Sequence, residues 1–241
     1  MPGATDQFDL KDVRAGKADP EYVDLLRRVL AIQSDCEIGG PHLYVETMLP
    51  EAPLKMDRLV VARTSAEEID HFRKFNNLLK ELEHDRTDLL FVANRQRYLE
   101  TFRGSIRTWA DFSAFSMLVD RVGKYQAEEF TTSSYLPATR ILAKILVEEE
   151  GHIAFGVAKM RALCATPEGK RRAQAALEHW FPRALDMFGH SESRRSERFM
   201  EWGLKQRTNA EQRRQYLAEV QDVVGGMGLV LPDPSANRHY E

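Results

Sequence analysis

The chain reads Glu67-Glu68-Ile69-Asp70-His71 at one point and Glu148-Glu149-Glu150-Gly151-His152 at another, and both stretches have the form Glu-Glu-x-x-His. On an α-helix, positions three residues apart lie on the same side, so the second glutamate and the histidine of each copy can bind one metal ion. Carboxylate with imidazole suits iron or manganese, and helical bundles build such sites from inward-facing side chains. The two motifs therefore predict two core helices of an all-α bundle.

The rest of the chain also has the pattern of helices. Apolar residues recur at three- and four-residue spacing, proline and glycine gather between these segments, and no segment has a convincing strand period. The long helices are expected at residues 20–48, 57–84, 108–131 and 138–164, with a short helix near 94–102 and supporting helices at 167–188, 191–203 and 209–224. We expect one domain over residues 1–241, with its core bundle at about 20–165, supporting helices at about 166–225 and a loose tail at 226–241.

Composition excludes several classes of protein. With 43% hydrophobic and 29% charged residues, the 241-residue chain is typical of a globular protein, and it has no apolar run of the length that spans a membrane. The net charge of −3 gives no electrostatic case for nucleic acid binding. Residues 1–9 lack the pattern of a signal peptide, and two cysteines, Cys36 and Cys164, fit a reducing compartment. A cytoplasmic protein is expected, without a membrane or nucleic acid partner.

A site with two metal ions also needs a carboxylate from each of the other two helices, and the symmetry of a hairpin selects them. Residues equidistant from the turn of an antiparallel hairpin lie at the same height along it. The midpoint between Glu37 and Glu68 falls in the proline-rich turn at residues 50–53, and that between Asp120 and Glu149 falls at the Ser133-Ser134 break. The predicted metal ligands are Glu37, Glu68, His71, Asp120, Glu149 and His152, and the four carboxylates among them are the predicted catalytic residues.

Glu128 and Glu129 are the alternatives to Asp120. With Glu129, the midpoint to Glu149 falls at Thr139, inside the following predicted helix. Glu129 would then lie nine residues, about 13 Å, along the helix from the level of Asp120. Hairpin symmetry therefore favours Asp120.

Each predicted ligand glutamate follows another acid, Glu67 or Glu148. A histidine that binds a metal usually donates its other ring N–H to an acceptor such as a carboxylate. Glu67 is therefore predicted to accept from His152, and Glu148 from His71.

Small residues border the predicted ligands. Gly40 and Gly123 come three residues after Glu37 and Asp120, where they would leave room beside the metals, although Gly39-Gly40-Pro41 could equally mark a helix kink. Cys36 is interpreted as a small buried thiol that could border the site.

Other residues of metal-binding type fit simpler interpretations. Glu81-Leu82-Glu83-His84 has helical spacing but no preceding acid, and it lies at a helix end in polar surroundings, as a surface ion pair would. The remaining histidines, interpreted as core or surface residues, are His42, His179, His190 and His239.

At this point the sequence resembles a known family, the ferritin-like di-iron proteins, and within them the catalytic subunit of bacterial phenylacetyl-CoA epoxidase and its relatives. The resemblance covers about residues 20 to 165. The third long helix provides an aspartate, Asp120, where many di-iron enzymes have a glutamate. In this respect the sequence resembles that catalytic subunit. The family also contains a structural paralogue that has lost its metal ligands. In this sequence all six ligand positions hold a residue that can bind metal. The segments that carry the resemblance are Ser34-Asp35-Cys36-Glu37-Ile38-Gly39-Gly40, Glu67-Glu68-Ile69-Asp70-His71-Phe72, Val119-Asp120-Arg121-Val122-Gly123-Lys124 and Glu148-Glu149-Glu150-Gly151-His152-Ile153-Ala154-Phe155-Gly156.

The resemblance implies a ferritin-like four-helix bundle with additional C-terminal helices, two iron ions (Fe²⁺/Fe³⁺) and dioxygen as co-substrate. It implies a monooxygenase that hydroxylates or epoxidises a small organic or acyl-CoA substrate. Because the sequence has no flavin, nicotinamide or iron–sulfur motif, electrons are expected from an external reductase. A homo-oligomer or a related helical subunit is the expected assembly. The alternatives are a di-iron oxidase or desaturase, a ferritin-like iron-binding protein or ferroxidase, and a scaffold that binds metal only for stability.

Overall fold

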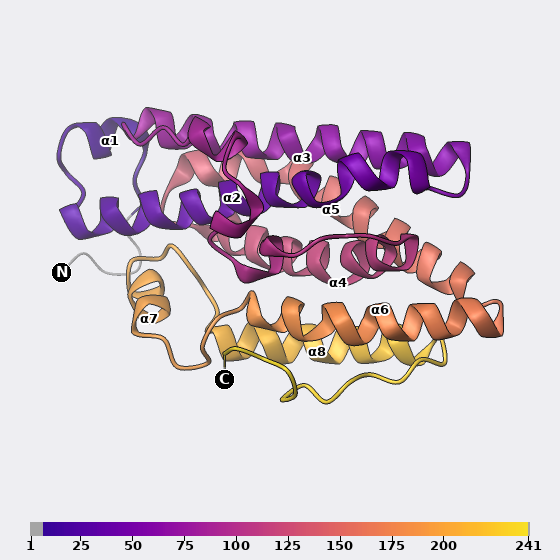
Figure 1. Ribbon diagram of the computed structural model, residues 1–241. Coiled ribbons are helices and arrows are strands. Elements are labelled where there is room, and N and C mark those ends of the chain that lie inside the picture. Colours follow the sequence, from indigo (N-terminus) through magenta and orange to yellow (C-terminus); the bar gives the residue numbers. More distant parts are fainter. Residues whose placement is uncertain (1–6, 241) are drawn as a thin grey trace.

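A computed structural model describes residues 7–240, so residues 1–6 of the N-terminal segment and residue 241 of the tail lie outside the description. Two long antiparallel hairpins form the bundle, α2 (Pro20–Glu51) with α3 (Lys55–Glu81) and α4 (Trp109–Glu128) with α5 (Leu136–Leu163) (Figure 1). The smaller elements are α1 (Leu10–Arg14), α6 (Pro167–Asp186), α7 (Arg194–Glu201), α8 (Asn209–Gly225) and 3₁₀ turns at Thr87–Leu90, Asn94–Gln96, Glu100–Arg103 and Glu129–Thr132.

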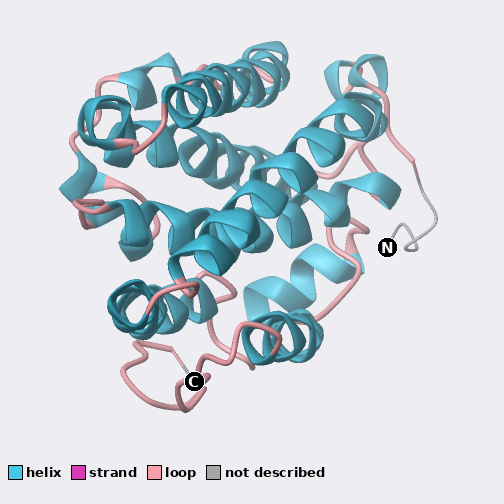
Figure 2. Cartoon of the chain, turned by 90° about the vertical axis from the view of Figure 1, so that its right-hand side faces the viewer, coloured by secondary structure: helices cyan, strands magenta, loops and turns pink. Residues whose placement is uncertain are grey.

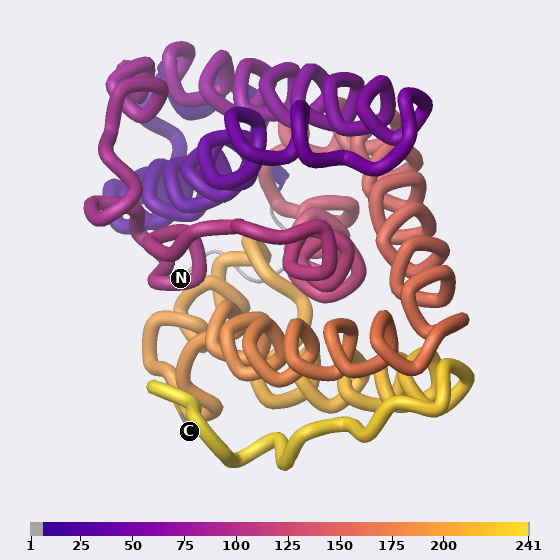
Figure 3. The backbone as a smooth tube through the Cα atoms, turned by 45° about the vertical axis from the view of Figure 1, so that its right-hand side comes forward, coloured from indigo at the N-terminus to yellow at the C-terminus, as the bar shows by residue number. Residues whose placement is uncertain are grey.

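The prediction of an all-α, ferritin-like four-helix bundle with additional C-terminal helices is confirmed. Over residues 7–240 there is no strand, only an isolated bridge between Phe8 and Tyr135 (Figure 2). Helix α4 lies between the α2–α3 hairpin and α6 (Figure 3). Helix α8 lies beside α6, on the same side of α4. In the described part of the chain, no helix is long and apolar enough to cross a membrane.

Local sequence signals explain where the helices begin. The Asp19 carboxylate accepts the Glu21 N–H (2.8 Å), and Pro20 occupies the first position of α2, where its missing N–H costs nothing. Thr108 caps α4 in a reciprocal pair with Asp111. These caps start α2 and α4 at fixed residues and so set the register of the acids that follow.

Several predicted boundaries are corrected. Helix α2 extends to Glu51, because Pro50 lies in its last turn rather than after it. The short helix expected near 94–102 is two separate 3₁₀ turns, and α7 spans Arg194–Glu201 rather than 191–203. The helix expected to reach 131 ends as an α-helix at Glu128 and continues as a 3₁₀ turn. The short α1 was outside the sequence prediction because its single turn is too brief to show a period.

Parts of the tail after α8, at residues 226–240, contact the rest of the molecule. Met227 and Leu229 are buried, and the Val230 N–H donates to Gln174 Oε1 (2.9 Å). The backbone N–H groups of His239 and Tyr240 both donate to the Asp186 carboxylate, at 2.9 and 3.2 Å. Apolar burial and these hydrogen bonds hold the tail against α6 and α8.

The hydrophobic core surrounds the two Glu-Glu-x-x-His motifs. The apolar neighbours of the predicted site are all buried: Leu30, Val61, Phe72, Phe75, Met117, Leu142, Ile145 and Ile153. Helices α4 and α5 approach each other closely at Gly156, where an added Cβ would overlap the backbone nitrogen of Met117. Glycine there allows α5 to lie against α4, which brings the α5 motif within reach of the α4 acid.

Candidate metal centre

The bundle encloses a small cavity of about 30 Å³ between its four long helices. Each helix contributes one acid to its lining: α2 Glu37, α3 Glu68, α4 Asp120 and α5 Glu149. The rest of the lining consists of Gln33, Cys36, Gly40, Phe102, Phe115, Val119, Gly123 and Met187. Ligand-type atoms of Glu37, Glu68, His71 and Glu149 all lie within 4.8 Å of one another, a spacing that could hold a metal ion.

His71 is fully buried between two sets of acids. Its Nδ1 faces three carboxylates that line the cavity, 3.3 Å from Glu37 Oε2, 3.4 Å from Glu149 Oε1 and 3.8 Å from Glu68 Oε2. Its Nε2 lies 3.0 Å from Oε2 of Glu148, on the side away from the cavity. The imidazole is therefore held from behind with its other nitrogen directed at three carboxylates.

His152 repeats this arrangement from the opposite hairpin. Its Nδ1 lies 3.2 Å from Glu68 Oε1 and 3.8 Å from Glu149 Oε2, and its Nε2 lies 2.9 Å from Oε2 of Glu67. The predicted crossed pairs, Glu67 with His152 and Glu148 with His71, are both confirmed. Each motif thus orients the histidine of the other.

The two Nδ1 atoms test whether the site fits a metal. Both are buried and have no hydrogen-bond partner of acceptable geometry. Because Nε2 carries the hydrogen that Glu148 or Glu67 accepts, Nδ1 of a neutral imidazole is left with a free lone pair. Buried polar atoms almost always have a partner, and here a cation between the carboxylates would supply it. The residues present fit a carboxylate–histidine metal centre.

Charge leads to the same conclusion. No lysine or arginine is among the described residues that line the cavity, so its buried carboxylates have no fixed cation beside them. Burial lowers the pKa of both imidazoles, but their attraction to Glu149 and its neighbouring carboxylates outweighs it, raising that of His71 to about 11 and that of His152 to about 12. Without metal, the imidazoles take up the positive charge that the site requires. Two divalent cations would balance four carboxylates and leave both imidazoles neutral.

Asp120 lies at the edge of this cluster. It lines the cavity, but it is not one of the four residues whose ligand atoms lie within 4.8 Å of one another. Burial, followed by the charge of Glu149, raises the pKa of Asp120 to about 8. The two rejected acids lie elsewhere: Glu129 accepts the Gln206 and Arg207 backbone N–H groups (2.6 and 2.9 Å), and Glu128 lies 3.3 Å from the Arg207 guanidinium.

Among the described residues, the other candidate histidines and Cys36 are not members of the group of possible metal ligands. The His84 side chain is outside the cluster, and His42 Nδ1 lies 2.5 Å from Arg97. Cys36 is buried and borders the cavity, and burial raises the pKa of its thiol. Gly40 and Gly123 both line the cavity, as the spacing predicted.

Gln33 and Met187 are among the lining residues that sequence reasoning did not place at the site. Gln33 donates from Nε2 to Glu37 Oε1 (2.5 Å), and both side chains are buried. Its position four residues before Glu37, on the same helix face, is the signal that could have revealed this contact. Met187 arrives from the end of α6, and no local pattern marks it.

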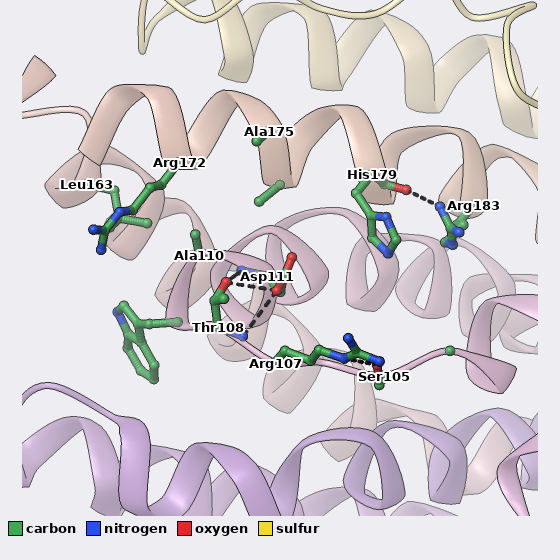
Figure 4. Close-up of a pocket in the computed structure, with 13 residues that line it drawn as sticks. Ser105, Arg107, Thr108, Ala110, Asp111, Leu163, Arg172, Ala175, His179 and Arg183 are labelled. Atoms are coloured by element: carbon green, nitrogen blue, oxygen red, sulfur yellow. Dashed lines mark hydrogen bonds between the residues drawn. The ribbon is translucent and has the colours of Figure 1, made fainter. Parts of the chain in front are cut away.

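A larger cleft of about 740 Å³ lies between the start of α4 and α6 and shares no lining residue with the carboxylate cavity (Figure 4). Arg107, His179 and Arg183 line it, together with Arg172, which pairs with Glu168 at 2.9 Å. Arg172 belongs to a run of three basic residues, Lys170-Arg171-Arg172, which are exposed and do not line the carboxylate cavity.

Two comparisons show which known proteins the chain is similar to. The chain is 29% identical over 209 residues to a component of the 1,2-phenylacetyl-CoA epoxidase of Escherichia coli (strain K12), and the match covers 81% of this chain and 67% of that protein. A family model described as phenylacetic acid catabolic protein matches residues 17–241. Because this match takes in nearly the whole chain, including the carboxylate cavity and the C-terminal helices, the protein belongs to the phenylacetic acid catabolic protein family.

Proposed function

We propose that the protein is a non-haem di-iron, oxygen-dependent monooxygenase that hydroxylates or epoxidises a small organic or acyl-CoA-type substrate. The observation that carries the proposal is the pair of buried, partnerless Nδ1 atoms of His71 and His152, each directed at carboxylates and each fixed from behind by a glutamate. The ligands in this proposal are Glu37, Glu68, His71, Asp120, Glu149 and His152.

When bound, two ferrous ions would supply the electrons that begin the reduction of dioxygen. The chain's own residues do the rest of the work in the site. Glu148 and Glu67 hold the imidazoles in one tautomer, and the four carboxylates supply the charge that retains two divalent ions. Phe102, Phe115 and Val119 form an apolar wall that limits access of water.

The organic substrate needs a space other than the carboxylate cavity, since about 30 Å³ accommodates only molecules near the size of water. A pocket of about 390 Å³ adjoins it. Its apolar lining includes Val29, Ile32, Leu99, Phe130, Met187, Phe188, Phe199 and Leu204. Lys205 also lines it, and burial lowers the pKa of this amine to about 8. An apolar acyl group with an anionic or polar attachment suits this pocket, and we call it the substrate pocket.

Partner proteins follow from the same proposal. The sequence contains no flavin, nicotinamide or iron–sulfur motif, so the electrons for repeated turnover come from an external reductase. The Escherichia coli relative is named as one subunit of its enzyme, which supports assembly with a related helical protein or with a second copy of the chain.

Single-turnover analysis with ¹⁸O₂ tests the function. Iron-loaded, chemically reduced protein is mixed with labelled oxygen and phenylacetyl-CoA, the compound in the relative's name, and the masses of the products are measured by mass spectrometry. The expected result is one labelled oxygen atom in the product, at no more than one product per site without a reductase. Oxidation of free ferrous ion through many turnovers, with no labelled product from this thioester or from other aromatic acyl thioesters, would instead show a ferroxidase. A desaturated, unlabelled product would show a desaturase.

A further inference from the structure

The carboxylate cavity and the substrate pocket are neighbours with a common wall. Two residues, Gln33 and Met187, line both spaces. Both side chains are nearly fully buried, at 4% and 5% exposure, so they fill the space between the two volumes rather than lying at a surface. A molecule that passes directly through this common wall, from the pocket to the carboxylates, passes these two side chains.

Gln33 is held in place by the site itself. Its amide Nε2 donates to Glu37 Oε1 at 2.5 Å, a hydrogen bond to a charged acceptor in a buried environment. Both residues lie on α2 one turn apart, so the backbone fixes the distance between them. Moving the Gln33 side chain out of the wall therefore requires that it release Glu37.

Met187 has a fixed backbone and an adaptable side chain. It follows the last residue of α6, and its carbonyl oxygen accepts the Gln126 Nε2 hydrogen at 3.1 Å. The chain then turns away at Gly189, whose φ of +74° is a conformation that favours glycine. An unbranched thioether with three rotatable bonds can change rotamer without displacing this anchored backbone.

We propose that Gln33 and Met187 form a gate between the substrate pocket and the metal centre, with Gln33 closing it by its hydrogen bond to Glu37. This inference rests on the proposed function only for the identity of the molecule that passes. Opening the gate frees one oxygen of Glu37, so access from the pocket and the position of this α2 carboxylate change together. Gln33 is thus a positioning residue, acting through Glu37.

Cys36 offers a test that needs neither metal nor turnover. Its thiol borders the carboxylate cavity and is buried, whereas Cys164 is partly exposed at the end of α5 and lines neither space. The full-length metal-free protein is treated with methyl methanethiosulfonate, and modification of each cysteine is followed by peptide mass spectrometry. Cys164 serves as the internal reference for reagent activity.

The variants are Gln33→Ala and Met187→Ala, with Leu204→Ala as the matched control. Leu204 is a buried residue of the substrate pocket that does not line the carboxylate cavity. Its truncation therefore measures how a packing cavity alone, with Gln33 and Met187 unchanged, affects modification of Cys36. Faster modification of Cys36 in Gln33→Ala than in this control reports access.

Both gate variants are expected to accelerate modification of Cys36 by about tenfold relative to Cys164, with Leu204→Ala within about twofold of wild type. Wild-type rates in both gate variants, or an equal acceleration in Leu204→Ala, would overturn the gate. These readouts are independent of the ¹⁸O₂ experiment, so failure of the monooxygenase proposal leaves the gate result standing, and the reverse also holds.

Discussion

His152 Nε2 on α5 lies 2.9 Å from Oε2 of Glu67 on α3. The matching contact joins His71 Nε2 on α3 to Oε2 of Glu148 on α5, at 3.0 Å. The two motif helices are therefore joined by a reciprocal exchange in which each provides one imidazole and one acceptor. Because both contacts point Nδ1 inward, the positions of the two candidate metal-binding nitrogens depend on residues outside the cavity.

Replacing the acceptors should weaken metal binding without unfolding the bundle. Glu67→Gln and Glu148→Gln each exchange a charged acceptor for a neutral amide that no longer fixes the tautomer, and the expected loss of metal affinity is about 10–100-fold. Competition with a chromogenic chelator measures it, with circular dichroism to verify helix content. Glu150→Gln is the control, since Glu150 is exposed and pairs with Lys124 at 3.0 Å. Unchanged affinity in both acceptor variants would show that the contacts do not tune the site.

The choice of Asp120 can be tested by metal content. Asp120→Ala is expected to lose one or both metal ions, because it removes the only acid that α4 contributes to the lining. Glu128→Ala and Glu129→Ala should retain both ions. Glu129→Ala should nevertheless cost about 1–3 kcal/mol of stability, because it leaves two backbone N–H groups without their acceptor. Elemental analysis of purified, iron-loaded protein distinguishes the variants, and a fully loaded Asp120→Ala variant would refute the assignment.

Metal binding should release protons. In the metal-free protein the carboxylates raise the pKa of His71 to about 11 and of His152 to about 12, so both imidazoles are protonated at pH 7. A metal takes the place of that proton on each ring, and Asp120, whose pKa is raised to about 8, must also lose its proton to become a ligand, so about three protons per chain should be released on loading. Calorimetric titrations with cobalt(II), in two buffers of different ionisation enthalpy, measure this number. Binding of two ions without proton release would contradict the assignment of the imidazoles as ligands.

The amine of Lys205 should make stability depend on pH in the alkaline range. Burial lowers its pKa from 10.5 to about 8, so below pH 8 the folded state carries a charge that burial disfavours. Between about pH 8 and 10.5 the unfolded state binds more protons than the folded state, so this residue makes stability rise with pH over that window. Lys205→Met should therefore stabilise the protein at pH 7 by about 1–3 kcal/mol, with a smaller gain at pH 10. Urea unfolding at both values measures it, and an equal gain at both would refute the prediction.

Two glycines of α5 should respond oppositely to alanine. At Gly156 the added methyl group would overlap the Met117 backbone, so Gly156→Ala should separate α4 from α5, cost about 1–3 kcal/mol and weaken metal binding. At Gly151 an added Cβ meets nothing within 4 Å, and Gly151→Ala should stabilise the helix by about 0.5–1 kcal/mol. Thermal unfolding and metal titration of both variants check the contrast. If Gly156→Ala changed neither stability nor metal affinity, the two helices would be able to shift apart without effect on the site.

The helices and the convergence of the acids could be predicted because their causes are local. Proline and serine mark the two turns, and hairpin geometry then sets which residues lie at equal height, which is why Glu37 and Asp120 could be selected from many acids. The predicted end of α2 is too early because it treats Pro50 as a helix breaker. A proline in the last turn removes few backbone hydrogen bonds, so the helix continues to Glu51. Met187 could not be predicted, because its place in the lining depends on how α6 packs across α4, and nothing in its own segment encodes that contact.

The docked tail has a consequence for the order in which the protein is built. All six candidate ligands lie between residues 37 and 152, whereas Tyr240, held to Asp186 by its backbone N–H, forms part of the substrate pocket. A ribosome releases the ligand-bearing helices long before this last stretch of wall. The carboxylate cluster can thus assemble on a chain whose substrate pocket still lacks one side, and cleavage before Tyr240 would return the folded protein to that open form.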